Sequence, residues 1–210
     1  MKQILIAIMI LASNALSAQT QQLSLKNLKF YEHQLYDVME IIDTNLLVAK
    51  LKQVENDYAQ NPTEINKTRL GIIYHETALN LTFFAKSTYK GYAQKSFDLL
   101  SQLETNPNTT PSLLPFIASY RASALALVGG ETKKLNLVGQ SFKLFEQAVE
   151  KYAEISYFPL FLRGSVAENL PWFFFSKKKF AKEDVEAIID KQDNVSWLAE
   201  VGDLVSLNFQ

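Results

Sequence analysis

The chain has 210 residues, of which 48% are hydrophobic, and this is enough for one globular domain with a substantial core. Its formal net charge of -1 excludes a global basic field for nucleic acid, and its lack of cysteine excludes disulfides and a cysteine-linked lipid anchor. Only 7 glycines and 6 prolines argue against a β-sandwich, which needs many turns.

Residues 1–18 have the pattern of a cleaved secretory signal peptide. Lys2 gives a positive start, Ile4–Ala12 is an unbroken apolar run, and small residues precede the cleavage point. The run is too short to span a membrane, which takes about 20 residues. A buried N-terminal helix is the alternative, but polar residues 19–22 follow at once. We therefore expect an exported protein, periplasmic or secreted, whose residues 19–210 form a single domain.

In residues 21–61, apolar side chains recur at steps of three and four, which predicts helix. Asp43 interrupts the pattern and is a good N-cap for a second helix, which Pro62 ends. Two helices forming a degenerate first unit and one bent helix both remain open for this stretch.

Residues 61–149 contain the same pattern twice. Tyr74–Leu81 aligns with Tyr120–Leu127 as Tyr-x-x-(Ser/Thr)-Ala-Leu-x-Leu, at an offset of 46 residues. Asn-Pro dipeptides begin at residues 61 and 106 and recur at nearly the same spacing. A repeat of this length indicates an array of helical units.

The first copy predicts a helix-turn-helix pair. Thr63 caps a helix whose apolar stripe continues to Phe84, and Ser87–Gly91 is a turn. A second helix starts around Ala93 and ends at Asn106 before a proline.

The second copy predicts another pair of helices. Its first helix starts near Leu113 and ends at Gly129-Gly130, because glycine tolerates the left-handed turn that follows a helix. Its partner helix covers Leu135–Ile155.

The C-terminal part predicts a fourth, less regular unit. Tyr157–Leu170 opens it, Trp172–Phe175 is a short apolar run, and Ser176–Lys179 is a polar break. A helix over Phe180–Lys191 follows, and a weaker one over Asp193–Asn208 would cover the open end of the array. The side chains expected to face inward from the first of these helices are Ala181, Val185, Ile188 and Ile189.

Three motifs in the first copy resemble those of the tetratricopeptide repeat family. They are Leu-Gly-x-x-Tyr over Leu70–Tyr74, Ala-x-x-x-Phe over Ala93–Phe97, and Pro107 at the close. The chain departs from the family where Lys67 replaces a tryptophan, where Ile117-Ala118 replaces the second Leu-Gly, and in its unit of about 46 rather than about 34 residues. The resemblance implies stacked antiparallel helix pairs with a concave face that binds peptides or proteins.

Several chemistries fail against the residues present. His75-Glu76 begins the zinc-protease pattern His-Glu-x-x-His, but Leu79 stands where the second histidine is required. No Gly-x-Ser-x-Gly turn and no glycine-rich phosphate loop occurs. His33 and Asp37 could share a metal ion, but no third ligand is near them in sequence. We therefore expect no metal, no cofactor and no catalytic residue.

Arginine is scarce, with three residues against 18 lysines, and its planar fork suits a carboxylate or phosphate. In a stacked array, equivalent positions of the first helices line one surface. The hypothesis is a groove that takes an acidic group of a partner and is bordered by Tyr74, Tyr120, Arg121, Arg163 and Asn169. The alternative is that the arginines form internal ion pairs, such as Arg163 with Glu168.

The aromatic run Trp172–Phe175 beside Lys177–Lys179 has two interpretations. Aromatic side chains next to lysines are what a membrane-surface anchor offers. Aromatic runs are more often part of a core, and this one is short.

Together these features predict an exported all-α protein, an array of three to four antiparallel helix pairs with a C-terminal covering helix. The expected function is non-catalytic binding of a protein or peptide partner. The alternative is a periplasmic carrier of a small or lipid-like ligand, with the C-terminal aromatic residues as pocket wall.

Overall fold

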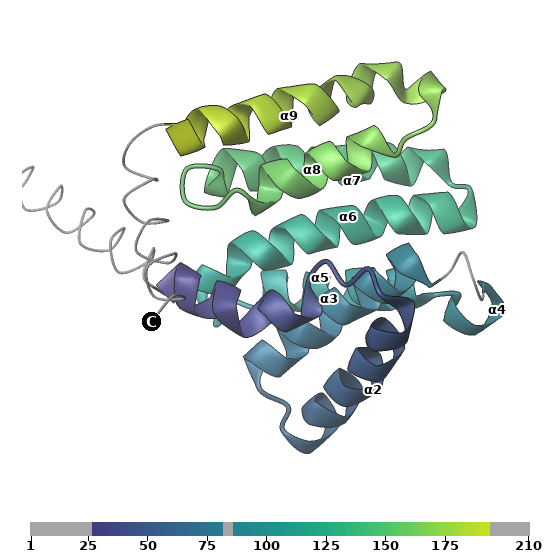
Figure 1. The fold of residues 1–210 in the computed structure, drawn as a ribbon, viewed down its shortest axis with the longest axis vertical. Coiled ribbons are helices and arrows are strands. Elements are labelled where there is room, and N and C mark those ends of the chain that lie inside the picture. Colours follow the sequence, from purple (N-terminus) through teal and green to yellow (C-terminus); the bar gives the residue numbers. More distant parts are fainter. Residues whose placement is uncertain (1–26, 82–85, 194–210) are drawn as a thin grey trace, which may run out of the picture.

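The computed structural model describes residues 27–81 and 86–193. Within these ranges every regular element is a helix and no strand is present, which confirms the predicted all-α class (Figure 1). The expected signal peptide over residues 1–18 lies outside the described residues. The expected covering helix over residues 193–208 also falls outside them, except for Asp193.

The elements follow one another with short connections. After a helix at residues 27–35, they are η1 (Tyr36–Val38), α2 (Thr44–Gln60), α3 (Glu64–Asn80), α4 (Lys86–Tyr89), α5 (Tyr92–Thr105), η2 (Pro111–Leu113), α6 (Leu114–Thr132), α7 (Leu135–Tyr152), α8 (Phe158–Glu168), η3 (Trp172–Phe174) and α9 (Phe175–Asp193).

Neighbouring helices pack as pairs: α3 with α5, α6 with α7, and α8 with α9 (Figure 1). Helix α6 joins the pairs, because outside its own pair it packs most extensively on α5, and also on α8 and, less, on α3. Helix α2 packs on α3. Helix α6 therefore lies at the centre of the molecule.

The N-terminal stretch forms two helices, so the single bent helix is excluded. The chain leaves η1 through Met39 and turns at Glu40, which has a left-handed backbone conformation with φ of 56°. Asp43 then caps α2, and its side chain accepts a hydrogen bond from the Leu46 N–H at 2.8 Å. Thr63 caps α3 in the same way, accepting from the Asn66 N–H at 3.3 Å. Both predicted N-caps are confirmed.

A close approach between α3 and α5 depends on Gly71. A Cβ atom at this position would lie 2.5 Å from Leu100 Cδ2 and 2.8 Å from its Cγ, far inside normal contact. The Ser96 hydroxyl donates to the Gly71 carbonyl at 2.8 Å across the same contact. The backbone of α3 at Gly71, the glycine of the Leu-Gly-x-x-Tyr motif, therefore packs directly against the Leu100 side chain of α5.

The expected helix end at Gly129-Gly130 is wrong, because α6 continues to Thr132. The left-handed residue that ends it is Lys133, with φ of 59°. Gly129 serves instead to let α7 approach: its Cβ would lie 3.0 Å from Val138 Cγ2 and 3.2 Å from the Val138 backbone nitrogen.

Two further boundaries differ from the expectation. The predicted turn at Ser87–Gly91 begins as the short helix α4, and only Gly91, with φ of 88°, makes the left-handed turn into α5. The predicted polar break at Ser176–Lys179 is helical, because α9 starts at Phe175. Lysine is a good helix former, and a polar run on an outer face does not interrupt a helix.

The inward face of α9 also differs from the prediction. Val185 and Ile189 are 52% and 49% exposed, whereas Asp184 is only 1% exposed. Ala181 and Ile188 are half-buried, as expected of inward positions. The face is rotated because Asp184 forms an ion pair with Arg163 on α8.

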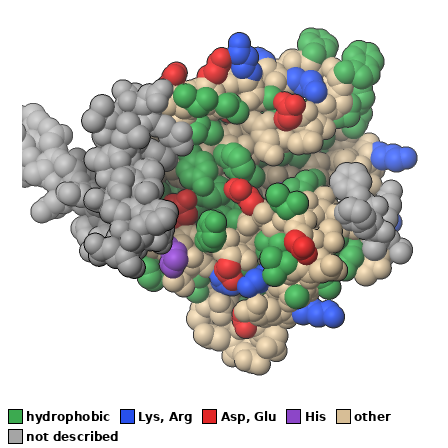
Figure 2. Space-filling view, in the orientation of Figure 1, with side chains coloured by type: hydrophobic (Ala, Val, Ile, Leu, Met, Phe, Trp, Pro, Cys, Tyr) green, Lys and Arg blue, Asp and Glu red, His purple; other side chains and the backbone are tan. Residues whose placement is uncertain are grey.

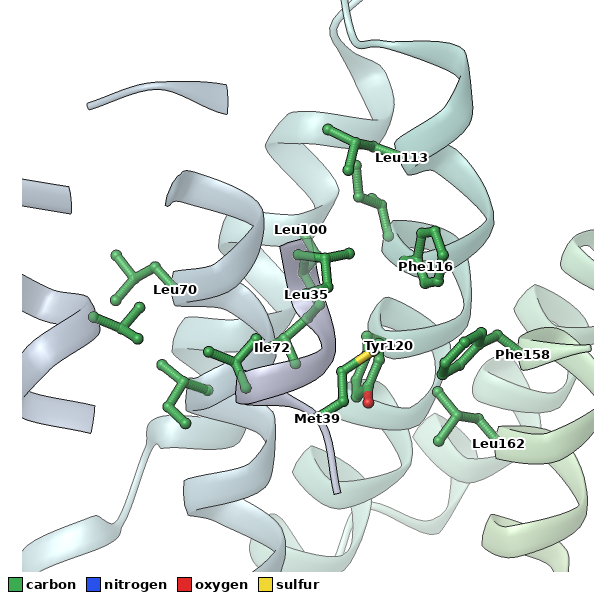
Figure 3. Close-up of a cluster of buried hydrophobic side chains, with 14 of the residues drawn as sticks. Leu35, Met39, Leu70, Ile72, Leu100, Leu113, Phe116, Tyr120, Phe158 and Leu162 are labelled. Carbon is green, nitrogen blue, oxygen red and sulfur yellow. The ribbon is translucent and has the colours of Figure 1, made fainter. Parts of the chain in front are cut away.

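The core is centred on α6 (Figure 3). Phe116 and Tyr120 of α6 meet Phe158 of α8, with the Phe116 and Phe158 ring centroids 5.0 Å apart. Met39 closes this group from the N-terminal side. Among the described residues only Pro111–Thr132 is long and apolar enough to cross a membrane, by length and composition alone, and 78% of its apolar window is buried inside the protein. Its central position explains that apolarity.

Candidate functional site

The structure does not bring the five predicted site residues to one surface. Arg121 forms an ion pair with Glu104 of α5, with Nε 2.5 Å from Oε2. Arg163 forms a two-pronged pair with Asp184, so the internal partner is not the suggested Glu168. Both guanidinium groups therefore already have a carboxylate from the chain itself.

The remaining residues are equally separate. Tyr120 is fully buried, and its ring packs edge-on against His75 with the centroids 5.0 Å apart. Asn169 ends α8 at the surface, where its amide donates to the Ser165 carbonyl at 2.9 Å. Tyr120 cannot border a groove in this arrangement, because the packing of α3, α6 and α8 closes around it.

Tyr74 is the predicted residue that does reach a surface with mixed chemistry. It lies on α3 between α2 and α5, half-buried, and its hydroxyl donates to Glu55 Oε1 of α2 at 3.2 Å. Tyr92 of α5 packs edge-on against it at 5.2 Å, and Tyr89 packs against Tyr92 at 5.9 Å. Lys95 stands over the Tyr92 ring, 4.2 Å from its centroid. We call these five residues the tyrosine surface.

Burial and a nearby carboxylate act on two phenol groups of the tyrosine surface, those of Tyr74 and Tyr92. Burial, followed by the negative charge of Glu55, raises the pKa of Tyr74 well above its usual value of 10.0. Burial and Glu55 also raise the pKa of Tyr92. At neutral pH the surface therefore offers phenol groups that donate and accept hydrogen bonds, a lysine cation and aromatic area, a combination common in binding interfaces.

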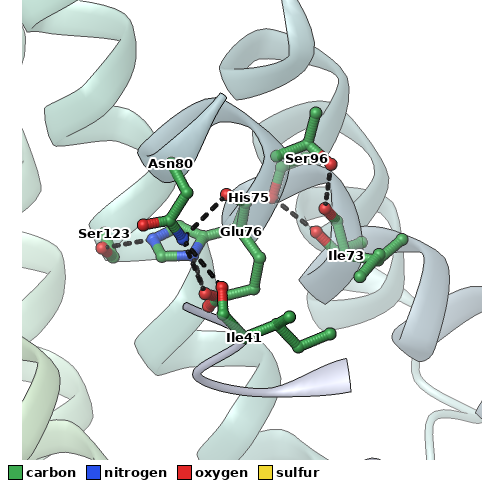
Figure 4. Close-up of polar contacts among 9 residues, drawn as sticks. Ile41, Ile73, His75, Glu76, Asn80, Ser96 and Ser123 are labelled. Atoms are coloured by element: carbon green, nitrogen blue, oxygen red, sulfur yellow. Dashed lines mark hydrogen bonds and ion pairs between the residues drawn. The ribbon is translucent and has the colours of Figure 1, made fainter. Parts of the chain in front are cut away.

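A second polar group lies inside the molecule, where α3 crosses α6 (Figure 4). His75 Nε2 is 2.7 Å from Ser123 Oγ, and His75 Nδ1 is 3.1 Å from Glu76 Oε1. With the ring proton on Nδ1, His75 donates to Glu76 and accepts from the Ser123 hydroxyl, so all three groups are satisfied. Asn80, one turn further along α3, donates to the Ile41 carbonyl at 3.4 Å and ties the N-terminal loop to this cluster.

Ser123, His75 and Glu76 are hydrogen-bonded in the same order as the serine, histidine and carboxylate of a serine hydrolase, but they are not accessible to a substrate. Ser123 is 3% exposed and His75 is 1% exposed. Ser123 also lies inside α6, where the backbone N–H groups are used by the helix and cannot stabilise an oxyanion. In this conformation the three side chains fix α3 on α6. Within the described residues, no group of three or more His, Cys, Asp or Glu side chains could hold a metal ion.

Glu40 forms the charged edge of this cluster. Partial burial, and secondly the negative charge of Glu76, raise the pKa of the Glu40 carboxyl above its usual value of 4.5. A raised folded-state pKa means that protonation favours the folded state. This contribution is complete at pH values below the unfolded-state pKa and is lost as pH rises through the folded-state pKa.

We expect Glu40→Gln, which stays neutral, to be more stable than the wild type at pH 7 by about 0.5 kcal/mol, discounted for the exposure of this side chain. The difference should shrink as pH falls from about 6 to about 4, measured by urea unfolding across that range. Glu150→Gln, at an exposed position on α7, is the control and should show no such trend. A stability difference for Glu40→Gln that is independent of pH would contradict the charge explanation.

No known family model, curated protein or solved structure matches the chain. The inference of function therefore depends on the geometry of this molecule.

Sequence reasoning missed two parts of these sites. The contact between His75 and Ser123 joins residues 48 positions apart, and they occupy different positions of the repeated pattern, so the alignment does not pair them. Tyr89, Tyr92 and Lys95 belong to the segment predicted as a turn followed by a helix, and their cluster around Tyr74 depends on how α5 packs on α3. The concentration of tyrosine in this segment was the available signal.

Proposed function

We propose that the protein is an exported, non-catalytic helical-repeat module that binds a protein or peptide partner through the tyrosine surface. The proposal includes a tetratricopeptide-like stacking of the helix pairs. The observation that carries it is the clustering of Tyr74, Tyr89 and Tyr92 with Lys95 and Glu55 on four helices, α2 to α5.

The arrangement of the chain supports this assignment. Tyr74 and Tyr120, which the repeat pattern aligns, lie on α3 and α6, and each of these is the first helix of a packed pair. Tyr74 stands in the gap between α2 and α5, which both pack on α3. Half-exposed tyrosine supplies large, rigid contact area at a low cost in side-chain entropy, and it is enriched among residues that dominate binding energy.

The experiment is site-specific photocrosslinking in the native host. A benzophenone side chain replaces Tyr89 at the tyrosine surface or, as the matched control, Val185 on the outer face of α9. We expect one covalent product of defined mass from position 89 and none from position 185. The partner is then identified by mass spectrometry and its affinity measured with purified protein.

The affinity test uses Tyr92→Ala and Lys95→Ala, each checked for unchanged melting temperature. Loss of an aromatic hot spot and its cation should weaken binding about tenfold each, or roughly 1.4 kcal/mol. Equal crosslinking from both positions, or unchanged affinity in both variants, would reject the tyrosine surface as the binding site.

The alternative function, a carrier with C-terminal aromatic residues as pocket wall, gains no support from the structure. Trp172 and Phe175 are 81% and 77% exposed, so they do not enclose a cavity.

A further inference from the structure

The turn between α8 and α9 presents aromatic side chains to solvent. Trp172, Phe173 and Phe175 are 81%, 48% and 77% exposed. We call these three residues the aromatic knob. The prediction that the aromatic run Trp172–Phe175 belongs to the core is therefore wrong for three of its four residues. Figure 2 shows hydrophobic side chains projecting at the corner where α8 ends and α9 begins.

The aromatic knob is held on an ordered support. Phe174, the fourth aromatic residue, is half-buried and packs against the cluster of Val138, Phe142 and Ala167. Its backbone N–H donates to the Pro171 carbonyl at 3.0 Å, closing the turn. Trp172 and Phe175 thus project from a fixed point, while the Phe173 ring packs on Phe174 with the centroids 4.9 Å apart and stays half exposed.

Basic side chains surround the aromatic knob. From Asn169 through Lys182 the sequence contains no acidic residue and four lysines. Lys179 and Lys182 have side chains that are 59% and 82% exposed, and each forms an ion pair with a glutamate one helical turn later, Glu183 and Glu186. Such solvent-exposed pairs are weak. The turn between α6 and α7 lies on the same side of the molecule as the turn between α8 and α9, on the right in Figure 1. It adds Lys133 and Lys134, which are both exposed.

We infer that this corner docks on the surface of an anionic phospholipid bilayer. Tryptophan and phenylalanine partition into the boundary between headgroups and acyl chains, and lysine ammonium groups reach the phosphates beside them. Anionic lipid attracts such a basic cluster, which gives the charge complementarity that an apolar partner surface alone would lack. The feature projects and is not a groove, so it suits a surface that can be penetrated.

Docking at this corner leaves the tyrosine surface free. The tyrosine surface lies on α2, α3, α4 and α5, and α9 packs on α8 at the other end of the array (Figure 1). The inference therefore does not depend on the proposed partner binding.

The test uses Trp172 as its own reporter. The chain has two tryptophans, and Trp197→Phe leaves Trp172 as the single fluorophore. The full-length protein is mixed with vesicles of phosphatidylcholine alone, or of phosphatidylcholine and phosphatidylglycerol in equal parts. We expect a blue shift of Trp172 emission and quenching by lipids brominated in their acyl chains, only with the anionic vesicles, and weakened by added salt.

Cosedimentation separates this corner from other segments of the chain. Combined replacement of Trp172, Phe173 and Phe175 by alanine should weaken vesicle binding at least about tenfold. The control replaces Tyr36, Ile42 and Leu46 by alanine, which are 76%, 86% and 55% exposed elsewhere, and should bind like the wild type. All variants share the same N-terminal residues and are checked for equal melting temperature.

Three results would overturn the inference. One is the absence of a Trp172 shift with anionic vesicles. Another is vesicle binding that survives the triple aromatic replacement, which would assign it to a different segment. The third is a blue shift that depends on protein concentration and not on lipid, which would assign the aromatic knob to contact with a second copy of the chain.

Discussion

Asp184→Ala should lower the free energy of unfolding by about 3–5 kcal/mol, the largest loss expected from a single charged residue in the described chain. Asp184 accepts from Arg163 Nε at 2.9 Å and from Arg163 Nη2 at 2.5 Å, so the pair is two-pronged and joins α9 to α8. The Arg163 guanidinium also lies 4.2 Å from the Phe180 ring centroid. Removing the carboxylate leaves a cation in a contact that is almost closed to water.

The comparison that identifies the cause uses a second variant. Burial raises the pKa of Asp184 above its usual value of 3.8 even beside Arg163, so desolvation outweighs the attraction of the pair. Replacing both partners by apolar residues, as Arg163→Met with Asp184→Leu, should therefore recover most of the stability lost in Asp184→Ala.

The measurement is urea unfolding at pH 7, with hydrogen exchange to locate the loss in α9. Glu186→Ala is the control, because Glu186 forms an exposed pair with Lys182 at 3.5 Å and should cost less than about 1 kcal/mol. If Asp184→Ala and Glu186→Ala cost the same, the buried ion pair does not hold α9 in place.

Gly71→Ala should lower the free energy of unfolding by about 1–3 kcal/mol, although alanine is the better helix former. The added methyl group would lie 2.5 Å from Leu100 Cδ2 and 3.3 Å from Leu99 Cδ2. Leu100 is fully buried and cannot move aside without disturbing the core. The expected loss therefore arises from forcing α3 and α5 apart.

The matched control is Gly130→Ala on α6. A Cβ atom at Gly130 meets nothing within 4 Å, so the variant should gain about 0.5–1 kcal/mol from helix propensity. Combining Gly71→Ala with Leu100→Ala tests the contact directly: the double variant should lose less than the sum of the two single losses, measured by chemical unfolding. Strict additivity would show that the close approach is not the cause.

The local parts of this fold could be predicted from the sequence. Asp43 and Thr63 cap their helices because a short polar side chain before an apolar repeat binds the free N–H groups of the first turn, whatever the rest of the chain does. Pro62 and Pro171 lie in breaks between helices, as predicted, because proline disfavours helical geometry in the residue before it.

The parts that failed depend on contacts across the fold. Gly129 was expected to end a helix, but the approach of Val138 from α7 explains the glycine equally well, and only the structure separates the two roles. Asp184 is buried and the neighbouring Val185 is exposed, the reverse of the prediction, because Asp184 forms a buried ion pair with Arg163. The periodicity of one helix cannot show which charged residue on another helix will pair with it.

The candidate site divides in the same way. Tyr74 was predicted as a surface residue of the array and lies on one, whereas the aligned Tyr120 is enclosed by Phe158 and His75. The two aligned positions differ in exposure because α8 packs on α6 and covers Tyr120. Pattern alone therefore placed both residues on a first helix and could not say which would be accessible.

Helix α6 packs on four other helices, α3, α5, α7 and α8. A helix inserted next to α6 would have to separate it from one of these four, and that would expose side chains that are now buried. Among the described helices, α9 packs mainly on α8, and α2 mainly on α3. An inserted helix is therefore expected to be tolerated better beside α2 or α9 than beside α6.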